Sequence, residues 1–274
     1  MVTIQNLSFS YKARPVFSGL SMELSEGSVY GLLGKNGAGK TTLLKIIAGL
    51  LSPKSGSIST LGEIPTKRTP KMLGEVFFLP EEFDLPRMSI TEYAKYYGVF
   101  YPNFSQKDLD RYLENLEVEA NQNLHTMSFG QKKKAMIAFA LACNTKLLIM
   151  DEPTNGLDIP SKSCFRRVIA SIAEQDRTII ISTHQVRDLD QLIDAVVILD
   201  ESSILLNASV GEITSKLCFT HLSPEEDAIY AEQTIHGRWG VKVNSEALDS
   251  PMDMEILFNA TTANRAAIKE IFKR

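Results

Sequence analysis

The sequence has few of the features that mark disulfide-rich or nucleic-acid-binding proteins. Only three cysteines occur among its 274 residues, and they lie far apart, without the short spacing of a metal site. We therefore expect reduced thiols rather than a disulfide framework. The 29 Lys and Arg residues and 33 Asp and Glu residues give a net charge of −4, which provides no general attraction for nucleic acid or an anionic membrane.

Long apolar runs and a secretory signal are also missing. The longest apolar run, Ala135 to Cys143, is about half as long as the roughly 20 residues that cross a bilayer. Met1 leads directly into a strand-like segment, without the charged and apolar regions of a signal peptide. The length suits one large domain, or one domain with a small appendage. We therefore expect a chain that does not cross a membrane by itself.

What the sequence does contain is a phosphate-binding motif. Residues 34–41, GKNGAGKT, fit G-x-x-x-x-G-K-[ST] and lie between a strand-like run, Val29–Leu33, and a helix-like run, Thr42–Ala48. The glycines let consecutive N–H groups point at phosphate oxygens, and the helix N-terminus adds to that field. Lys40 would reach the terminal phosphates, and the Thr41 hydroxyl would bind Mg²⁺. The expected nucleotide contacts are Gly34, Lys35, Asn36, Gly37, Ala38, Gly39, Lys40, Thr41 and Thr42.

A second motif lies at the end of another apolar strand. The run Leu147–Met150 is followed by Asp151 and Glu152. A P-loop enzyme needs an acidic residue at such a strand end to hold Mg²⁺, and Asp151 fits that role. Glu152 can orient and deprotonate the attacking water. Alone, this segment would be an ordinary strand and polar turn; together with the P-loop it indicates a nucleoside triphosphatase.

The remaining pattern predicts an α/β fold with a mostly parallel sheet. Strand-like runs alternate with helical segments, which is typical of right-handed crossover connections. The expected strands are 2–10, two within 21–33, 56–61, 76–79, 147–150, 178–182 and 195–199. Residues 89–142 read as helical, beginning with a capping box at Ser89 and Glu92. In the tail we expect strands at 239–243 and 254–258 and a helix at 263–273.

These motifs, in this order, resemble the ATP-binding cassette (ABC) ATPases, the nucleotide-binding subunits of ABC transporters. The resemblance covers about residues 1–215. It implies a P-loop cassette with an N-terminal antiparallel β subdomain and a helical subdomain at about 88–142. Residues 216–274 would form a small α+β C-terminal extension of unknown role.

The resemblance implies that two cassettes enclose ATP between them. Residues 127–131, MSFGQ, are similar to the family signature, usually Leu-Ser-Gly-Gly-Gln. Ser128, Gly130 and Gln131 would bind nucleotide on the opposing subunit, since a helix N-terminus attracts phosphate. Phe129 departs from the usual glycine and is expected to affect closure of the dimer. Asp158, in the segment resembling the D-loop, would couple the two sites and also cap the next helix.

Three further positions follow from the resemblance. His184, in Ser-Thr-His at a strand end, fits the switch histidine that contacts the γ-phosphate. Tyr11 fits the aromatic that stacks on adenine, with Phe9 and Phe17 as rivals. Glu81 stands where the family usually has the Q-loop glutamine, and its carboxylate can also bind Mg²⁺. Glu81 adds negative charge near phosphate, so its effect on turnover stays open.

Two features have both an ordinary and a functional interpretation. Six aromatic residues at helical spacing are expected to form the core of the helical subdomain, with a grip for a membrane partner as the alternative. They are Tyr93, Tyr96, Tyr97, Phe100, Tyr101 and Phe104. The run Lys132–Lys134 is expected to form a solvated helix face, or else to balance the charge of bound ATP.

The sequence thus predicts a Mg²⁺-ATP hydrolase in which Lys40, Glu152 and His184 are catalytic and Thr41, Asp151 and Glu81 hold the metal. The resemblance implies a second ATPase subunit, in a homodimer or heterodimer, and a separate membrane permease. It places the chain on the inner face of the cell membrane, and it favours a bacterial exporter. The main alternative is a soluble ABC ATPase that drives assembly or regulation. A nucleotide sensor without hydrolysis is a second alternative, because of Phe129 and Glu81.

Overall fold

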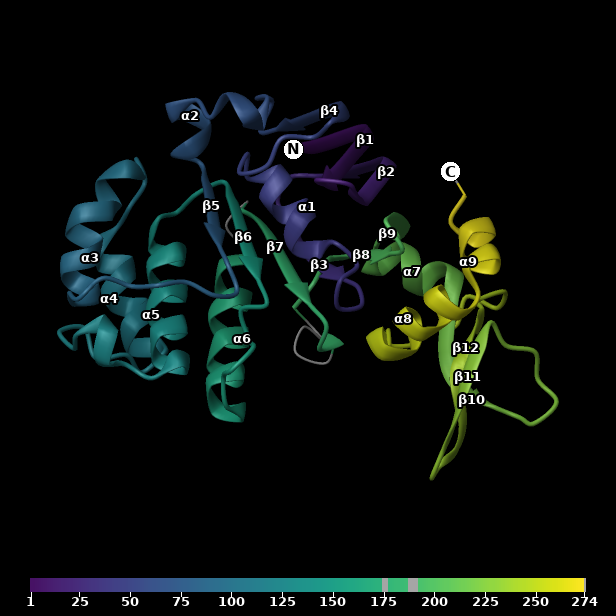
Figure 1. Ribbon diagram of the computed structural model, residues 1–274. Coiled ribbons are helices and arrows are strands. Elements are labelled where there is room, and N and C mark those ends of the chain that lie inside the picture. Colours follow the sequence, from purple (N-terminus) through teal and green to yellow (C-terminus); the bar gives the residue numbers. More distant parts are fainter. Residues whose placement is uncertain (174–176, 187–191, 274) are drawn as a thin grey trace.

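The computed structural model describes residues 1–173, 177–186 and 192–273 (Figure 1). Within them lie a six-stranded central sheet, an N-terminal antiparallel sheet and a C-terminal antiparallel sheet. The predicted α/β class with a mostly parallel sheet is confirmed.

The central sheet places the two predicted phosphate-site motifs close together. Its strand order is β5-β6-β7-β3-β8-β9, and every neighbouring pair is parallel except β8 with β9. The strands are β3 (Val29–Leu33), β5 (Val76–Leu79), β6 (Leu147–Asp151), β7 (Thr178–Thr183), β8 (Ala195–Asp200) and β9 (Ser203–Ser209). Since only β7 separates β3 from β6, the loops after these two strands share one edge of the sheet.

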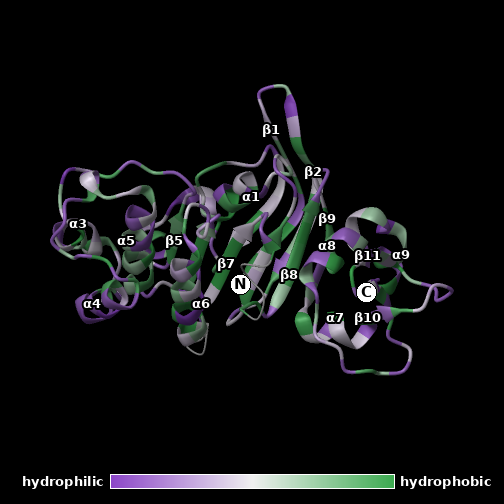
Figure 2. Ribbon diagram, turned by 90° about the horizontal axis from the view of Figure 1, so that it is seen from below, coloured by the Kyte–Doolittle hydropathy of each residue, from purple (hydrophilic) through white to green (hydrophobic). Residues whose placement is uncertain are grey.

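Helices cover both faces of this sheet, which explains why its parallel strands are almost completely buried and mostly apolar (Figure 2). Leu148 and Met150 of β6 pack in one core with α5 (Phe129–Ala142) and α6 (Ile159–Ala173). Leu147 and Ile149 belong to the other core, with α1 (Lys40–Ile47). Successive side chains of a strand point to opposite faces, so a run of apolar residues fills both layers.

The N-terminal sheet closes the α1 side of the molecule. Its order is β2-β1-β4, formed by β1 (Val2–Tyr11), β2 (Arg14–Leu24) and β4 (Ser55–Thr60), and both pairings are antiparallel. The tight β1–β2 turn brings Tyr11 and Arg14 opposite each other. This turn therefore carries both side chains toward the P-loop region.

Helical segments form the left part of the molecule in Figure 1. They include α3 (Ile90–Tyr97), α4 (Gln106–Asn115) and α5, with the short turns η2 (Gly98–Phe100) and η3 (Leu124–Thr126). Before them come η1 (Pro65–Lys67) and α2 (Pro70–Leu73). The Ser89–Glu92 capping box predicted for α3 is present.

The aromatic residues of this helical part divide into a buried and an exposed set. The rings of Tyr93, Tyr101 and Phe104 pack around Phe139 of α5. Tyr96, Tyr97 and Phe100 are instead 62%, 40% and 68% exposed. The expectation of a purely core stripe is therefore wrong for half of it, because α3 turns one side to solvent.

The C-terminal part follows α7 (Val210–Lys216) and lies at the right in Figure 1. Its sheet has the order β10-β12-β11, from β10 (Leu217–Leu222), β11 (Tyr230–Thr234) and β12 (Gly237–Val243). Two helices follow, α8 (Met254–Ala263) and α9 (Arg265–Ile271).

The predicted strand at 254–258 is wrong, because these residues begin α8. Asp253 caps this helix by accepting hydrogen bonds from the backbone N–H groups of Glu255 and Ile256. Met254, Leu257 and Ala260 recur every three residues and are buried. The local alternation of apolar residues at 254, 256 and 258 resembles a strand, but the longer helical period determines the structure.

Candidate functional site

The P-loop connects β3 to α1 and points its backbone into a cavity. Gly39 has a φ of +107°, and a Cβ at this position would lie 2.9 Å from the ring of Phe17. Glycine is therefore required both for the left-handed backbone and for the close approach. Lys40 Nζ donates to the backbone oxygen of Gly34 at 2.8 Å, and Lys40 is 7% exposed. The loop is thus fixed by its own lysine as it enters the helix.

The acidic end of β6 lies directly beside this loop. Thr41 Oγ1 donates to Asp151 Oδ2 at 2.6 Å, and Ser182 Oγ donates to Asp151 Oδ1. Across the described residues, no group of three or more His, Cys, Asp and Glu side chains forms a metal cluster. Mg²⁺ is usually held by one or two carboxylates together with substrate phosphates and water. The hydroxyl and carboxylate oxygens of Thr41 and Asp151 fit that mode of binding.

Glu152, the candidate base, lies between two other predicted catalytic residues. Its Oε1 is 3.5 Å from Lys40 Nζ, and its Oε2 is 2.9 Å from Nδ1 of His184. The backbone N–H of His184 also donates to Oε2 at 3.3 Å. The side chain of Glu152 is 7% exposed and that of His184 is 34% exposed. The structure therefore brings all three residues together, at the place where the P-loop enters α1 and where β6 and β7 end.

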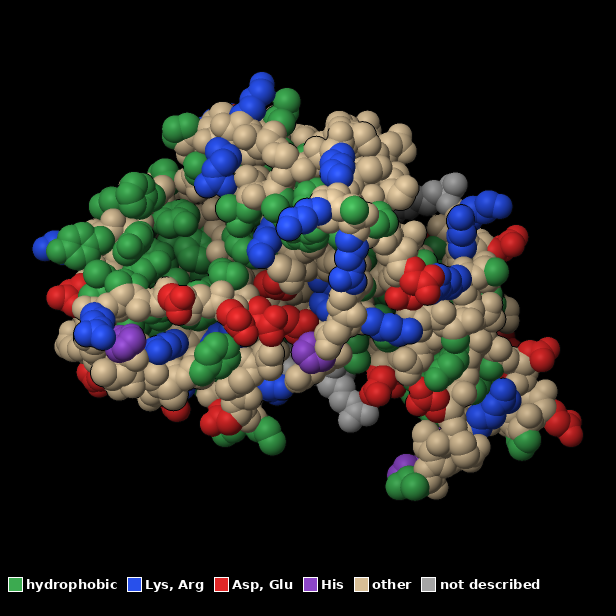
Figure 3. All heavy atoms as spheres, viewed as in Figure 1, with side chains coloured by type: hydrophobic (Ala, Val, Ile, Leu, Met, Phe, Trp, Pro, Cys, Tyr) green, Lys and Arg blue, Asp and Glu red, His purple; other side chains and the backbone are tan. Residues whose placement is uncertain are grey.

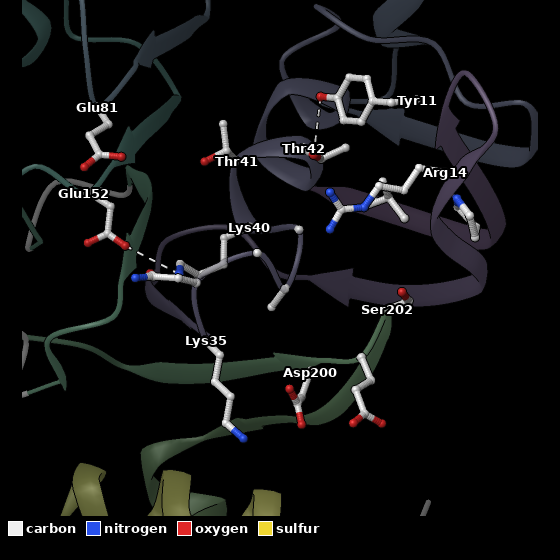
Figure 4. Close-up of a pocket in the computed structure, with 17 residues that line it drawn as sticks. Tyr11, Arg14, Lys35, Lys40, Thr41, Thr42, Glu81, Glu152, Asp200 and Ser202 are labelled. Carbon is white, nitrogen blue, oxygen red and sulfur yellow. Dashed lines mark hydrogen bonds and ion pairs between the residues drawn. The ribbon is translucent and has the colours of Figure 1, made fainter.

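A cavity of about 650 Å³ opens over Lys40 and Glu152 (Figure 4), whereas His184 lines a separate, smaller cavity together with Gly34 and Thr183. Among the predicted residues, those that line the larger cavity are Tyr11, Lys35, Asn36, Gly37, Ala38, Gly39, Lys40, Thr41, Thr42, Glu81 and Glu152. Gly34 and Asp151 do not line this cavity, but each accepts a hydrogen bond from a residue that does, Lys40 and Thr41 respectively. The Oε1 of Glu81 accepts a hydrogen bond from Asn155 Nδ2 at 2.7 Å.

The aromatic residue that faces this cavity is Tyr11. Its side chain is 46% exposed, and Thr42 Oγ1 donates to its hydroxyl at 3.4 Å. Phe9 and Phe17 are both buried in the core beneath the β1–β2 sheet. Phe9 supports Tyr11 through an edge contact with ring centroids 4.9 Å apart. Of the three candidates, Tyr11 is the one positioned to stack on a base.

Some cavity residues were missed by the sequence reasoning. They are Arg14, Pro15, Val16, Asp200, Glu201 and Ser202. Asp200 ends β8, a parallel strand beside β3, so the rule that ligands lie at the carboxyl ends of such strands could have identified this turn. Arg14 carried no signal of its own, since its place follows from the β1–β2 turn.

The signature and D-loop residues lie outside the cavity. Ser128 caps α5 by accepting from the backbone N–H of Gln131, whose side chain in turn accepts from the N–H of Ser128. Asp158 caps α6 by accepting from the N–H of Ser161 at 2.9 Å, and its hydrogen bonds with the side chain and the backbone of Ser161 lower its pKa. The structure thus shows their capping roles within one chain.

Phe129, the unusual signature residue, packs within its own chain. A Cβ placed on Gly156 would lie 2.7 Å from the Phe129 ring, so the ring rests on this glycine. Gly156 has a φ of +80° and belongs to the predicted D-loop. The two predicted interface segments are therefore in contact before any second subunit is considered.

The structure contradicts the solvated-face prediction for the lysine run. Lys132 and Lys134 are partly exposed, but Lys133 is completely buried. Its Nζ donates to the backbone oxygens of Glu152 at 2.7 Å and Asn155 at 3.2 Å. Burial lowers the pKa of Lys133, while the surrounding carboxylates act in the opposite direction. Periodicity alone could not show that the loop after β6 passes over this face of α5.

Comparisons with known proteins agree with this geometry. The family model described as ABC transporter matches residues 17–155. The chain is 31% identical over 234 residues to YdbJ of Bacillus subtilis (strain 168), described as an uncharacterized ABC transporter ATP-binding protein; 82% of this chain and 75% of YdbJ are covered. It is 34% identical over 211 residues to the bacitracin transport ATP-binding protein BcrA of Bacillus licheniformis, covering 75% and 68% respectively.

A solved structure with the same arrangement is the ATP binding subunit of an ABC transporter. It matches with a TM-score of 0.69 at 26% sequence identity, over 78% of this chain and 91% of that chain.

Proposed function

Because the chain belongs to the ABC transporter family of ATP-binding proteins, we propose that it hydrolyses Mg²⁺-ATP to drive transport through a separate membrane subunit. The observation that carries this proposal is the position of Glu152 between Lys40 and His184, beside the Thr41–Asp151 pair. P-loop, metal-binding oxygens and a carboxylate base thus converge at one cavity. Such convergence is what phosphoryl transfer to water requires.

The residues around the cavity have complementary roles in this reaction. The P-loop amides and Lys40 hold the β- and γ-phosphates, while Tyr11 stacks on the base. Thr41, Asp151 and Glu81 would supply oxygen ligands for Mg²⁺, and the ion would supply positive charge to offset that of the phosphates. A γ-phosphate is a stronger partner for Lys40 than the carboxylate 3.5 Å away, so ATP binding frees Glu152 for water.

Hydrolysis then proceeds by in-line attack of water on the γ-phosphorus. Glu152 takes the proton of the attacking water, and the bond to the β-phosphate oxygen of ADP breaks. His184 keeps the carboxylate oriented, because its Nδ1 and backbone N–H both contact Oε2. The protein's contribution is therefore placement of the base and stabilisation of phosphate charge.

We further propose that two cassettes close around the nucleotides. Ser128 and Gly130, at the N-terminus of α5, would face the γ-phosphate bound by the other subunit. Gln131 would support Ser128 through the capping box, and Asp158 would lie near the shared interface. Loss of the γ-phosphate removes the group that joins both halves, so hydrolysis reopens the dimer.

The membrane partner is supported by an apolar groove beside Glu81. The groove has a volume of about 590 Å³ and is lined by β5, the Pro80–Leu85 segment, α3 and α5. Figure 3 shows it as a hollowed hydrophobic surface at the left of the molecule. Exposed apolar surfaces of this kind mark protein interaction sites. A short amphipathic helix of a membrane subunit fits this groove and would sense the Q-loop position.

The proposed location is the inner face of the cell membrane, through that partner. No helix in the described ranges is long and apolar enough to span a bilayer. BcrA is named for bacitracin transport, which favours a bacterial exporter role for this chain as well. The cargo would be determined by the membrane subunit.

The first test is the variant Glu152→Gln, which keeps the shape of the side chain but removes the base. We expect ATP binding to persist and phosphate release to fall roughly 100-fold or more, because general-base catalysis contributes that much. The measurement is steady-state phosphate release beside nucleotide affinity. Unchanged turnover would contradict the assignment of the base.

The same variant tests the transport role. Tagged Glu152→Gln protein is captured with ATP from detergent-solubilised membranes of its native cell. A multi-span membrane protein in equal amount supports the transporter. Soluble partners alone would favour the alternative, an ABC ATPase that drives assembly or regulation.

A further inference from the structure

Lys133 is a buried cation that takes no part in the proposed steps of hydrolysis. Its side chain is completely buried, although lysine is among the residues that most rarely are. Two of its donors reach the backbone oxygens of Glu152 and Asn155, at 2.7 and 3.2 Å. Its Nζ also lies 5.2 Å from the centre of the Phe129 ring, within reach of a cation–π contact. A buried ammonium requires such partners, and here all of them belong to the predicted nucleotide machinery.

The carbonyl that Lys133 binds belongs to a strained residue. Glu152 has a φ of +48°, a left-handed conformation that is costly for a side chain other than glycine. Its N–H bonds to the backbone and side-chain oxygens of Ser182, and its C=O accepts from Lys133 and from the N–H of Asn155. The peptide groups on both sides of Glu152 are therefore anchored. This anchoring directs the carboxylate toward Lys40 and His184.

Lys133 is also linked to Glu81. Asn155 connects the two residues. Its backbone oxygen accepts a hydrogen bond from Lys133, and its own side-chain amide donates to Glu81 Oε1 at 2.7 Å. The carboxylates that surround Lys133 electrostatically are Glu81, Glu82, Asp151 and Glu152. Glu81 is the additional one among them, since it stands where the family usually has a neutral glutamine. Lys133 thus faces four carboxylates, one more than a neutral residue at position 81 would leave.

We propose that Lys133 is a positioning residue, which holds Glu152 in its strained backbone conformation and offsets the charge that Glu81 adds. This inference rests on the proposed function, because it requires Glu152 to act on water. If Lys133 merely filled the core, its substitution would lower stability but not kcat, and the effect would not depend on the residue at position 81.

The test compares variants of the full chain for kcat and for the KM of ATP. Lys133→Met keeps the length and apolar stem but removes charge and donors; Lys132→Met is the matched control, one residue earlier and partly exposed. We expect Lys133→Met to lower kcat roughly tenfold or more while the KM stays within about twofold, since the P-loop is untouched. Lys132→Met should behave as the wild type.

Glu81→Gln in both backgrounds separates positioning from packing. In the Lys133→Met protein, Glu81→Gln should raise kcat severalfold, because it removes the carboxylate that has lost its counter-charge. The same substitution should change kcat less in the wild type. If Lys133→Met does not fold, Lys133→Gln, which keeps a donor without charge, is compared with the same control and the same double variant.

The outcomes are distinguishable. Wild-type turnover in the folded Lys133 variant overturns the inference, and so does a loss of kcat that Glu81→Gln leaves unchanged. A wild-type chain that binds ATP but releases no phosphate overturns the proposed function itself, and with it the role of Lys133.

Discussion

At the scale of single residues, glycine at 156 determines how the signature and D-loop segments meet. The Phe129 ring rests on the Cα of Gly156, whose φ of +80° favours glycine. A methyl group there would add a steric conflict to the backbone strain. The family's usual glycine at position 129 would leave this contact empty, so Phe129 and Gly156 act as a pair.

We predict that Gly156→Ala lowers the free energy of unfolding more than the same substitution at a glycine with no aromatic neighbour. Gly62 has a φ of +76° and nothing within 4 Å of an added Cβ, so Gly62→Ala measures the backbone cost alone. That cost is about 1–2 kcal/mol, and Gly156→Ala should exceed it. Chemical denaturation of both variants, with and without Phe129→Ala, measures the difference. Equal losses at 62 and 156 would show that the ring simply moves away.

At the scale of secondary structure, α8 depends on a single capping residue. Asp253 accepts from two backbone N–H groups of the helix and, through Oδ2, from Nε1 of Trp239 at 2.9 Å. This carboxylate therefore joins the helix to β12. Trp239 is the single tryptophan in the sequence, so its fluorescence reports on this junction alone.

We predict that Asp253→Ala weakens the C-terminal part by about 1–2 kcal/mol, through loss of the cap and of the tryptophan bond. Urea denaturation followed by tryptophan fluorescence should show a lower midpoint than the wild type. Asp249→Ala, an exposed residue in the preceding loop, is the control and should leave the midpoint unchanged. An unchanged Asp253→Ala midpoint would mean that packing alone holds α8.

The same helix shows where sequence reasoning reaches its limit. The central strands were predictable, because a run of apolar residues such as Leu147–Met150 indicates a strand buried on both faces. This inference needs no knowledge of the neighbouring strands. The start of α5 was predictable from the Ser128 cap, a local signal. Residues 254–258 were assigned incorrectly, because a segment of five residues fits both the period of a strand and the period of a helix. Burial of Lys133 depends on a loop 19 residues away, which no local pattern contains.

At the scale of the whole molecule, the C-terminal part contacts two residues that line the proposed nucleotide cavity. Arg265, at the start of α9, pairs with Asp200 Oδ2 at 2.6 Å and Glu201 Oε2 at 2.7 Å. Asp200 ends β8 and Glu201 follows it in the β8–β9 turn, and both line the cavity. These contacts hold the Arg265 guanidinium on the cavity's acidic rim and lower the pKa of Glu201. The C-terminal part thus supports the wall of the proposed ATP site by contacting two residues that line it.

We predict that Arg265→Ala weakens ATP binding without impairing the chemical step. Loss of the guanidinium leaves the Asp200 and Glu201 carboxylates without their counter-charge beside a cavity that must hold an anion. The Arg265 side chain is 41% exposed, which limits the effect to a roughly two- to fivefold rise in the KM for ATP.

Steady-state hydrolysis over a range of ATP concentrations provides the measurement, with Lys269→Ala as the control, since Lys269 is an exposed cation one turn further along α9. A counter-charge acting across an exposed rim is screened by salt, so the difference between Arg265→Ala and the control should shrink as ionic strength rises. Equal KM values for both variants at low salt would instead assign Arg265 to holding the extension in place. The cavity would then be electrostatically independent of residues 216–274.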